Sequence, residues 1–257
     1  MLHFSQKIQT IEPSATLGIT SKAKAMKQSG EDVVVLAAGE PDFDTPDIIK
    51  EAASKAIRDG FTKYTPTSGT ISLKEAICGK FSADNALKYS PENIIVSNGA
   101  KHSLYNIFQA ICDPGDEILI IHPYWLSYPE MVKLAGGVPK VIQTDAADGF
   151  KVSADQIERQ IGPRTRALIL NSPSNPAGAV YDKKDLERIA AACLRHDMII
   201  ISDEIYEKII FDGKKHYSIA SLGEDVKART VVVNGTSKSF AMTGWRIGYL
   251  ACDALLA

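Results

Sequence analysis

The chain has 257 residues, of which 29 are Lys or Arg and 31 are Asp or Glu, so its formal net charge is -2. A charge this close to zero gives no broad field for nucleic acid or an anionic membrane, and a small-molecule ligand is favoured. A chain of this length buries roughly three quarters of its unfolded surface, enough for one large core or two modest domains.

The four cysteines and five histidines show no spacing typical of redox or metal sites. The cysteines lie far apart in apolar surroundings, where a thiol behaves as a small hydrophobe, and no histidine pair has metal-ligand spacing. No segment approaches the roughly 18 apolar residues of a membrane span, and the N-terminus lacks a signal-peptide pattern. We therefore expect a soluble, cytoplasmic protein without a metal site.

The first predicted elements are a surface helix over residues 14–29 and a short strand over residues 33–38. The strand leads into G-E-P-D-F-D-T-P, whose Gly39 can place backbone against a ligand and whose Thr45 is expected to cap the next helix. That helix should turn one apolar face toward a core. The residues of this face are Ile48, Ile49, Ala52, Ala53, Ala56 and Ile57.

The next polar cluster is Gly99-Ala100-Lys101, which lies between a predicted strand at 94–98 and a helix with apolar residues at helical spacing. Free amides at such a helix start can bind a phosphate, and the helix dipole adds on the order of 0.3 to 2 kcal/mol for a negative charge. An ordinary strand-to-helix turn is the commoner alternative.

Two further strands end in candidate ligands. The strand at 117–121 leads to Trp125, which offers a flat face to a heteroaromatic ring, although a tryptophan there is usually part of the core. The strand at 166–170 leads into N-S-P-S-N-P-A-G, which contains Asn175, and asparagines in such turns normally satisfy local backbone groups. A further strand is expected at 138–142.

The apolar run 198–201 is typical of a strand buried on both faces of a parallel sheet. It ends in S-D-E-I-Y-E, which places Asp203 and Tyr206 at the strand's carboxyl end. A lone buried carboxylate is costly, so Asp203 must be paired or have a shifted pKa.

The last predicted strand, 231–233, precedes the turn that contains Lys238. Arg246 follows between two glycines, where backbone without side chains lets a guanidinium approach an anion closely. Lysine and arginine beside a glycine turn favour a phosphorylated electrophile as ligand, whereas a solvated lysine and a strand-end ion pair are the alternative. Because strands and helices alternate and polar clusters follow strands, we predict an α/β fold with one large domain and a ligand site beyond the strand ends.

Six motifs in this order resemble those of class I aminotransferases of fold type I, nearest the bacterial aspartate aminotransferase subgroup. They are G-E-P-D-F-D-T-P, N-G-A-K, P-Y-W-x-S-Y-P-E, N-S-P-S-N-P-A-G, S-D-E-I-Y-E and S-K-S-F-A-M-T-G-W-R-I-G-Y. The resemblance implies a three-layer α/β/α fold with a mostly parallel sheet and pyridoxal 5'-phosphate as cofactor. It further implies a large cofactor domain at 46–257 and an N-terminal segment at 1–45 that packs with a small domain.

The resemblance also implies residue roles. Lys238 would hold the cofactor covalently and move a proton at the substrate Cα, and Asp203 would pair with the pyridine nitrogen. Asn175 and Tyr206 would hydrogen-bond the ring's 3' oxygen, and Trp125 would stack on the ring. The expected phosphate ligands are Gly99, Ala100, Ser237 and Arg246, with Lys101 close by. Gly39, Trp125 and Asn175 would lie against the substrate, and Tyr64 would reach the phosphate of a neighbouring subunit, which implies a homodimer.

The sequence departs from the family in two places. Family members continue through a C-terminal small domain whose arginine binds the substrate α-carboxylate; we expect that domain to be absent, and no arginine here takes the role. Gly235 stands three residues before Lys238, where many relatives have a phosphate-binding serine, so Ser237 or Thr236 must substitute.

The function implied is transamination of an L-amino acid, aspartate first, with 2-oxoglutarate. Lys101 and Thr16 are candidates for recognising the distal carboxylate, although a phosphate-facing or solvated Lys101 is an equal alternative. An inactive cofactor-binding fragment and a lyase of the same fold are the competing functions. Because an arginine on the α-carboxylate orients the substrate Cα–H bond, we expect weak or absent turnover without the C-terminal domain.

Overall fold

The computed structural model describes residues 3–37 and 39–257, and within them seven strands form one sheet in the order β1-β7-β6-β5-β4-β2-β3. Strands β2 to β6 run parallel, and β7 runs antiparallel to β1 and β6. The strands are β1 (Ile94–Ser97), β2 (Glu117–Ile121), β3 (Val138–Ile142), β4 (Thr165–Asn171), β5 (Ile199–Asp203), β6 (Thr230–Gly235) and β7 (Gly248–Ala251). The mostly parallel sheet predicted from the sequence is confirmed.

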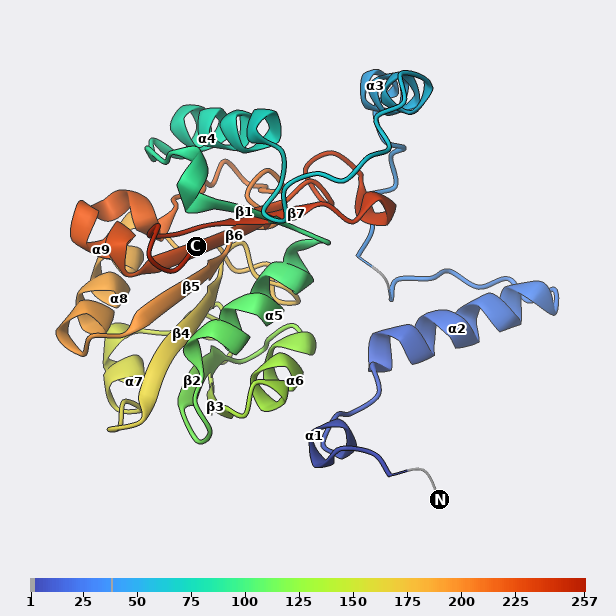
Figure 1. Cartoon of the computed structure of the whole chain (residues 1–257). Helices are drawn as coiled ribbons and strands as arrows, with labels where there is room; N and C mark the ends of the chain where they lie inside the picture. The colour runs from blue at the N-terminus through green and yellow to red at the C-terminus, as the bar shows by residue number, and fades with distance from the viewer. Residues whose placement is uncertain (1–2, 38) are drawn as a thin grey trace.

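The sheet is buried because helices cover both of its faces (Figure 1). On one face, Leu104 and Phe108 of α5 (Ala100–Ile111) and residues of α6 (Ser127–Leu134) pack on Ile120. The other face, which carries Leu119, is covered by helices that include α4, α7 and α8. Those helices are α4 (Ile71–Asn85), α7 (Ala154–Glu158), α8 (Lys183–Arg195) and α9 (Glu224–Ala228). This is the expected three-layer α/β/α arrangement.

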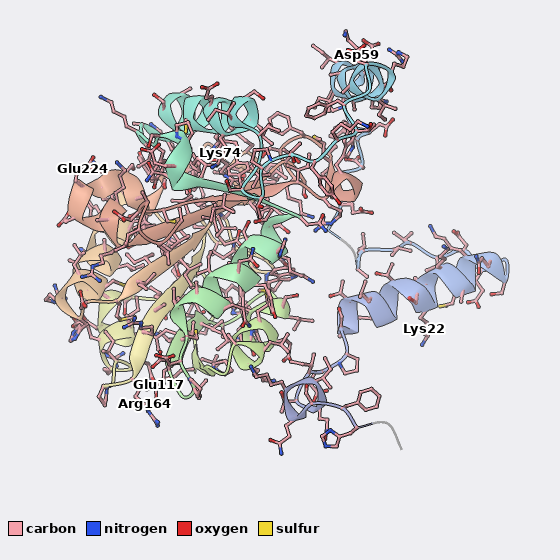
Figure 2. All side chains as sticks on the ribbon, viewed as in Figure 1. Lys22, Asp59, Lys74, Glu117, Arg164 and Glu224 are labelled. Atoms are coloured by element: carbon pink, nitrogen blue, oxygen red, sulfur yellow. The ribbon has the colours of Figure 1, made fainter. Side chains whose placement is uncertain are left out.

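The register of the parallel strands brings their carboxyl ends to one edge of the sheet. Asn171 at the end of β4 is opposite Asp203 at the end of β5, which is opposite Val233 of β6. At the other edge lie Glu117 and Arg164 (Figure 2), where the Glu117 amide donates to the Arg164 carbonyl at 2.8 Å. Polar residues that follow the strands therefore gather on the side away from these two.

The N-terminal helices project from this body (Figure 1). They are α1 (Gln6–Gln9), α2 (Ala15–Gln28) and α3 (Asp47–Arg58). Helix α2, with Lys22 on it, lies apart from the sheet (Figure 2). None of the helices in the described residues combines the length and apolarity needed to cross a membrane.

Three predictions for the N-terminal part are wrong. Residues 33–37 are not in a strand, because no neighbouring strand bonds to their backbone, and residue 38 lies outside the described residues. Helix α3 forms, but its apolar face does not reach the core, and Ile48 is 76% and Ile57 70% exposed. Thr45 does not cap α3; its hydroxyl donates to the Ala241 carbonyl at 2.6 Å, and Pro46 holds the cap position.

Candidate active site

A cavity of about 630 Å³ opens at the carboxyl edge of the sheet, a size typical of small-molecule sites. Its walls come from the ends of β4, β5 and β6, from the start of α5, and from the N-terminal segment. Ten of the predicted site residues line it: Gly39, Ala100, Lys101, Trp125, Asn175, Asp203, Tyr206, Ser237, Lys238 and Arg246. Gly99 adjoins it through Arg246, and Tyr64 lies outside it.

Lys238 enters the cavity from the turn after β6. Its Nζ donates to the carbonyl of Gly39 and lies 5.6 Å from the centroid of the Tyr206 ring. Burial is the main cause that lowers the pKa of Lys238; Arg246 lowers it further, while Glu40 opposes the shift. A larger share of this amine is therefore neutral and nucleophilic near pH 7 than of an exposed lysine.

Asp203 forms the floor of the cavity and is 3% exposed. Its Oδ2 accepts a hydrogen bond from the Tyr128 hydroxyl at 2.6 Å, and its Oδ1 accepts one from the Ile205 amide at 3.3 Å. Burial raises the pKa of Asp203 to about 6, against the effect of both hydrogen bonds. The carboxylate is thus held at a site that favours a cationic partner.

Hydrogen bonds connect the loop after β4 to the end of β5. The Asn175 side chain donates to the Tyr206 hydroxyl at 3.3 Å, and the backbone amide of Asn175 donates to Asn171 Oδ1 at 2.8 Å. The Asn171 side chain in turn donates to the Asp203 carbonyl at 2.9 Å. Asn175 and Tyr206 are therefore oriented as a pair, and Asn171, for which the sequence predicts no role, links them to Asp203.

The start of α5 is arranged to receive an anion. Gly99 at the N-cap has φ +86°, no side chain caps the helix, and the first turn has no acidic residue. Within the described part of the chain, no acceptor bonds to the amides of Ala100 and Lys101. A side chain at Gly99 would meet the Arg246 guanidinium, which lies against this helix start. Free amides, the helix dipole and a guanidinium together suit a phosphate.

Lys101 stands between this anion site and Trp125. Its Nζ lies 4.9 Å from the Trp125 ring centroid. Burial, and secondarily Arg246, lower the pKa of Lys101. Thr16 of α2 lines the same cavity, so the pair singled out in the sequence is brought to one site.

Ser237, rather than Thr236, faces the cavity. The Thr236 hydroxyl donates to the Ile247 carbonyl at 3.3 Å. A Cβ on Gly235 would lie 2.8 Å from the Ile247 carbonyl oxygen and 3.1 Å from Gly248 Cα, so a side chain there would force the backbone apart. The glycine that differs from many relatives thus permits close packing of β6 on β7.

The N-terminal segment reaches the cavity through contacts with the turn after β6. Besides the bond from Lys238 to Gly39, the Thr243 hydroxyl donates to Glu40 at 2.6 Å and the Trp245 indole donates to Thr45 at 3.1 Å. Tyr64, by contrast, is fully exposed and does not line the cavity of its own chain. Its predicted contact with the phosphate of a neighbouring subunit stays a prediction.

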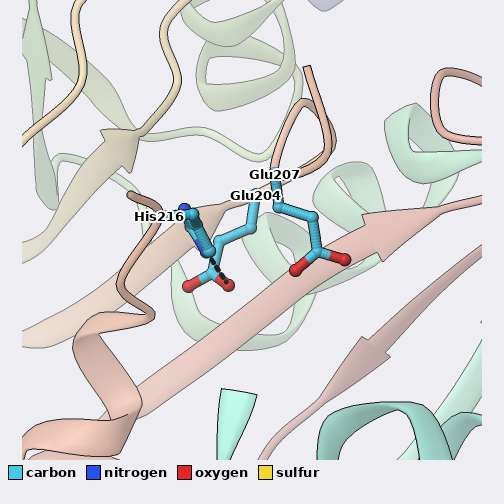
Figure 3. Close-up of side chains that lie close together, drawn as sticks. All are labelled: Glu204, Glu207 and His216. Atoms are coloured by element: carbon cyan, nitrogen blue, oxygen red, sulfur yellow. Dashed lines mark hydrogen bonds and ion pairs between the residues drawn. The ribbon is translucent and has the colours of Figure 1, made fainter. Parts of the chain in front are cut away.

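Behind the cavity floor, the buried Glu204 and Glu207 and the half-buried His216 form a cluster whose carboxylate oxygens and ring nitrogen lie within 4.8 Å of one another (Figure 3). Each carboxylate oxygen already accepts from a protein donor. The donors are Ser202, Ser218 and His216 for Glu204, and Lys80 and Asn85 for Glu207. The segment from Asp203 to Glu207 therefore directs Asp203 and Tyr206 to the cavity and both glutamates into an ion network.

Comparisons with known proteins agree with this arrangement. The family model described as "Aminotransferase class I and II" matches residues 31–257. The chain is 53% identical over 250 residues to an aspartate aminotransferase of Bacillus sp. (strain YM-2), covering 97% of this chain and 64% of that protein. It is 50% identical over 256 residues to an aspartate/prephenate aminotransferase of Nitrosomonas europaea, covering 99% and 64%. The structure of Thermus thermophilus aspartate aminotransferase with maleate superposes with a TM-score of 0.96 at 46% identity, covering 100% of this chain and 66% of that one.

The fold and the cavity are those of a fold type I aminotransferase. The chain belongs to the class I and II aminotransferase family, and it spans about 64% of the length of the curated relatives named above. Enzymes of this family depend on pyridoxal 5'-phosphate. The residues present fit that group, because the unpaired amides at the start of α5 suit its phosphate and a buried carboxylate suits its ring nitrogen.

Proposed function

We propose that this chain is the cofactor-binding part of an enzyme that transfers the amino group of aspartate to 2-oxoglutarate. One observation carries the proposal: Lys238, Asp203 and the uncapped start of α5 line a single cavity. The names of the relatives support aspartate as the amino donor.

When bound, pyridoxal 5'-phosphate supplies a carbonyl that amines condense with and a ring that accepts electron density from the substrate Cα. Lys238 would hold the cofactor through Nζ, and as a neutral amine it would take the proton from Cα. Asp203 would keep a proton on the ring nitrogen by pairing with it as a carboxylate. Its depressed pKa opposite a pyridinium stays a prediction for the loaded state.

The remaining cavity residues would orient the cofactor. The amides of Ala100 and Lys101, the Ser237 hydroxyl and Arg246 would bind the phosphate. The Tyr206 hydroxyl and the Asn175 side chain would donate to the ring's 3' oxygen. These two donors already lie within hydrogen-bond distance of each other, so one oxygen could accept from both. Trp125 would cover one face of the ring, and Gly39 leaves room for the substrate.

For substrate choice, we propose that Lys101 and Thr16 receive the distal carboxylate of aspartate. Both line the cavity, and Lys101 stands on the side of Trp125. A carboxylate there would gain a charge-assisted hydrogen bond, which an uncharged side chain such as that of alanine cannot make.

For assembly, we propose a homodimer in the cytoplasm, with residues 1–45 packed against a further domain and Tyr64 directed to the partner's phosphate. The support is the concentration of exposed apolar side chains between residues 4 and 71, which a monomer would leave in water. They include Phe4, Leu17, Leu36, Phe43, Ile48, Ile57, Phe61 and Tyr64.

The test of the cofactor assignment is covalent capture at Lys238. Protein incubated with pyridoxal 5'-phosphate should show a visible absorption band, and borohydride should fix the cofactor to the peptide that contains Lys238. Lys238→Ala should abolish the fixation, whereas Lys215→Ala, a lysine that does not line the cavity, should leave it unchanged. Equal fixation in both variants would reject the assignment.

The proposed function also predicts that residues 1–257 bind the cofactor but turn aspartate over weakly. The described cations that line the cavity are Lys101, Lys238 and Arg246, and the proposal gives each another task than holding the α-carboxylate. Coupled assay of 2-oxoglutarate-dependent oxaloacetate formation measures this. Turnover equal to that of a relative with the full family length would show that another group orients the substrate.

A further inference from the structure

Tyr128 lies at the cavity floor, and the proposed function leaves it without a role. It is in the first turn of α6 and is 2% exposed. Its hydroxyl donates to Asp203 Oδ2 at 2.6 Å. Its ring meets Trp125 edge to face, with centroids 5.4 Å apart and planes at 88°. One side chain therefore contacts both the acid that would pair with the cofactor's ring nitrogen and the tryptophan that would stack on the cofactor.

We propose that Tyr128 is a positioning residue that fixes the Asp203 carboxylate and the Trp125 ring relative to each other. It acts through those two side chains, so the inference rests on the proposed function. The edge-to-face contact defines the tilt of Trp125, and the hydroxyl selects one orientation of the carboxylate, which leaves Oδ1 for the Ile205 amide.

The hydroxyl also favours the charged form of Asp203. A hydrogen bond donated to a carboxylate lowers its pKa, and Tyr128 is the largest such effect on Asp203. Burial and the carboxylate of Glu204 act in the opposite direction, and Tyr206 stands nearby on the same segment. The other charged groups that line the cavity are Lys101, Lys238 and Arg246. Burial and Asp203 itself raise the pKa of Tyr128 well above 10, so its proton stays in place at neutral pH.

The experiment is a titration of Asp203 in the cofactor-free protein. Carboxyl-¹³C aspartate labelling with Asp203→Asn as the assignment control should give a midpoint near pH 6 for the wild type. Tyr128→Phe keeps the ring and removes the hydroxyl, so the midpoint should rise by about one to two pH units, the size expected for a hydrogen bond to a charged group. An unchanged midpoint would overturn the proposal.

A matched control separates positioning from general stability. Tyr181 is also 2% exposed, and its hydroxyl accepts from the Val152 amide at 2.8 Å, away from Asp203. Tyr181→Phe should lower Tm without moving the Asp203 midpoint. An equal shift in both variants would contradict a specific role.

Trp125 supplies a second measurement. Its near-ultraviolet circular dichroism, assigned with Trp125→Phe, should persist in Tyr128→Phe and weaken in Tyr128→Leu, which lacks the aromatic edge. Should Tyr128→Phe fail to fold, ring-¹³C tyrosine in the wild type should still show Tyr128 following the Asp203 midpoint, and a flat signal would count against the contact. All these measurements use cofactor-free protein, so their failure is distinct from failure of covalent capture at Lys238.

Discussion

Asp203 shows how a single buried carboxylate exchanges stability for function. Burial raises its pKa from 3.8 to about 6, so the folded protein binds a proton more tightly than the unfolded chain does. Stability of the cofactor-free protein should therefore fall as the pH rises from about 4 to about 6 and stay lower above that range. The ionised carboxylate that the proposed chemistry needs is a cost to the empty fold.

Asp203→Asn should remove this dependence. Relative to wild type, the cofactor-free variant should gain stability between pH 4.5 and pH 8, by on the order of 2 kcal/mol. Urea unfolding at the two pH values measures the difference. With cofactor bound, the ranking at pH 8 should reverse, because the carboxylate then has a cationic partner. Parallel stability curves for both proteins would refute the shifted pKa.

Lys101 is the residue at which substrate choice can be tested. Lys101→Ser should raise KM for aspartate about tenfold or more, the value of a charge-assisted hydrogen bond, and change KM for alanine much less. Spectral titration of cofactor-loaded protein replaces KM where turnover is slow. Lys183→Ser, on the exposed start of α8, serves as control. An equal effect on both amino acids would remove Lys101 from substrate recognition.

At the scale of elements, the sequence predicts the buried parallel strands well and the flanking helices unevenly. The run at 166–170 is apolar after Arg166 and the run at 198–201 is apolar throughout; both are followed by turn residues, and both form strands. Helix α4 was not predicted, because its buried residues Ile77, Phe81 and Asn85 form only a narrow stripe with one polar member. Strand β7 is not predicted either, because it directly follows the glycine-containing segment around Arg246, whose composition is typical of a turn.

The same contrast holds within the site. Lys238, Asp203 and Asn175 follow strands in recognisable motifs, so they could be predicted to converge. Tyr128 could not, because its bond to Asp203 joins residues 75 positions apart and a buried tyrosine in a helix is usually read as packing. The sequence indicated that the buried Asp203 carboxylate needs a partner, and the family resemblance pointed to the cofactor nitrogen, but nothing in the sequence pointed to a protein donor for it.

At the scale of the whole molecule, the exposed apolar side chains of the N-terminal part predict association. Sedimentation equilibrium with cofactor should give a mass of twice 27.9 kDa. Replacing Ile48 and Ile57 together by lysine should shift the protein toward the monomer, because charges would enter the apolar face of α3. Val138→Lys, an exposed position on the edge strand β3, should leave the dimer unchanged. A monomer in the wild type would contradict the proposed dimer.

The two-sided segment from Asp203 to Glu207 has a practical consequence for variants of this protein. Glu207 is held by Lys80 and Asn85, and Glu204 by Ser218, none of which lines the cavity. The same five residues, 203–207, therefore contribute both to cofactor binding and to the stability of the fold. A ligand that binds only the folded form raises its free energy of unfolding by mass action. A variant that is purified without the absorption of bound cofactor therefore need not carry a substitution in the cavity. A substitution among the partners of Glu204 and Glu207, on the opposite face of the sheet, can have the same result.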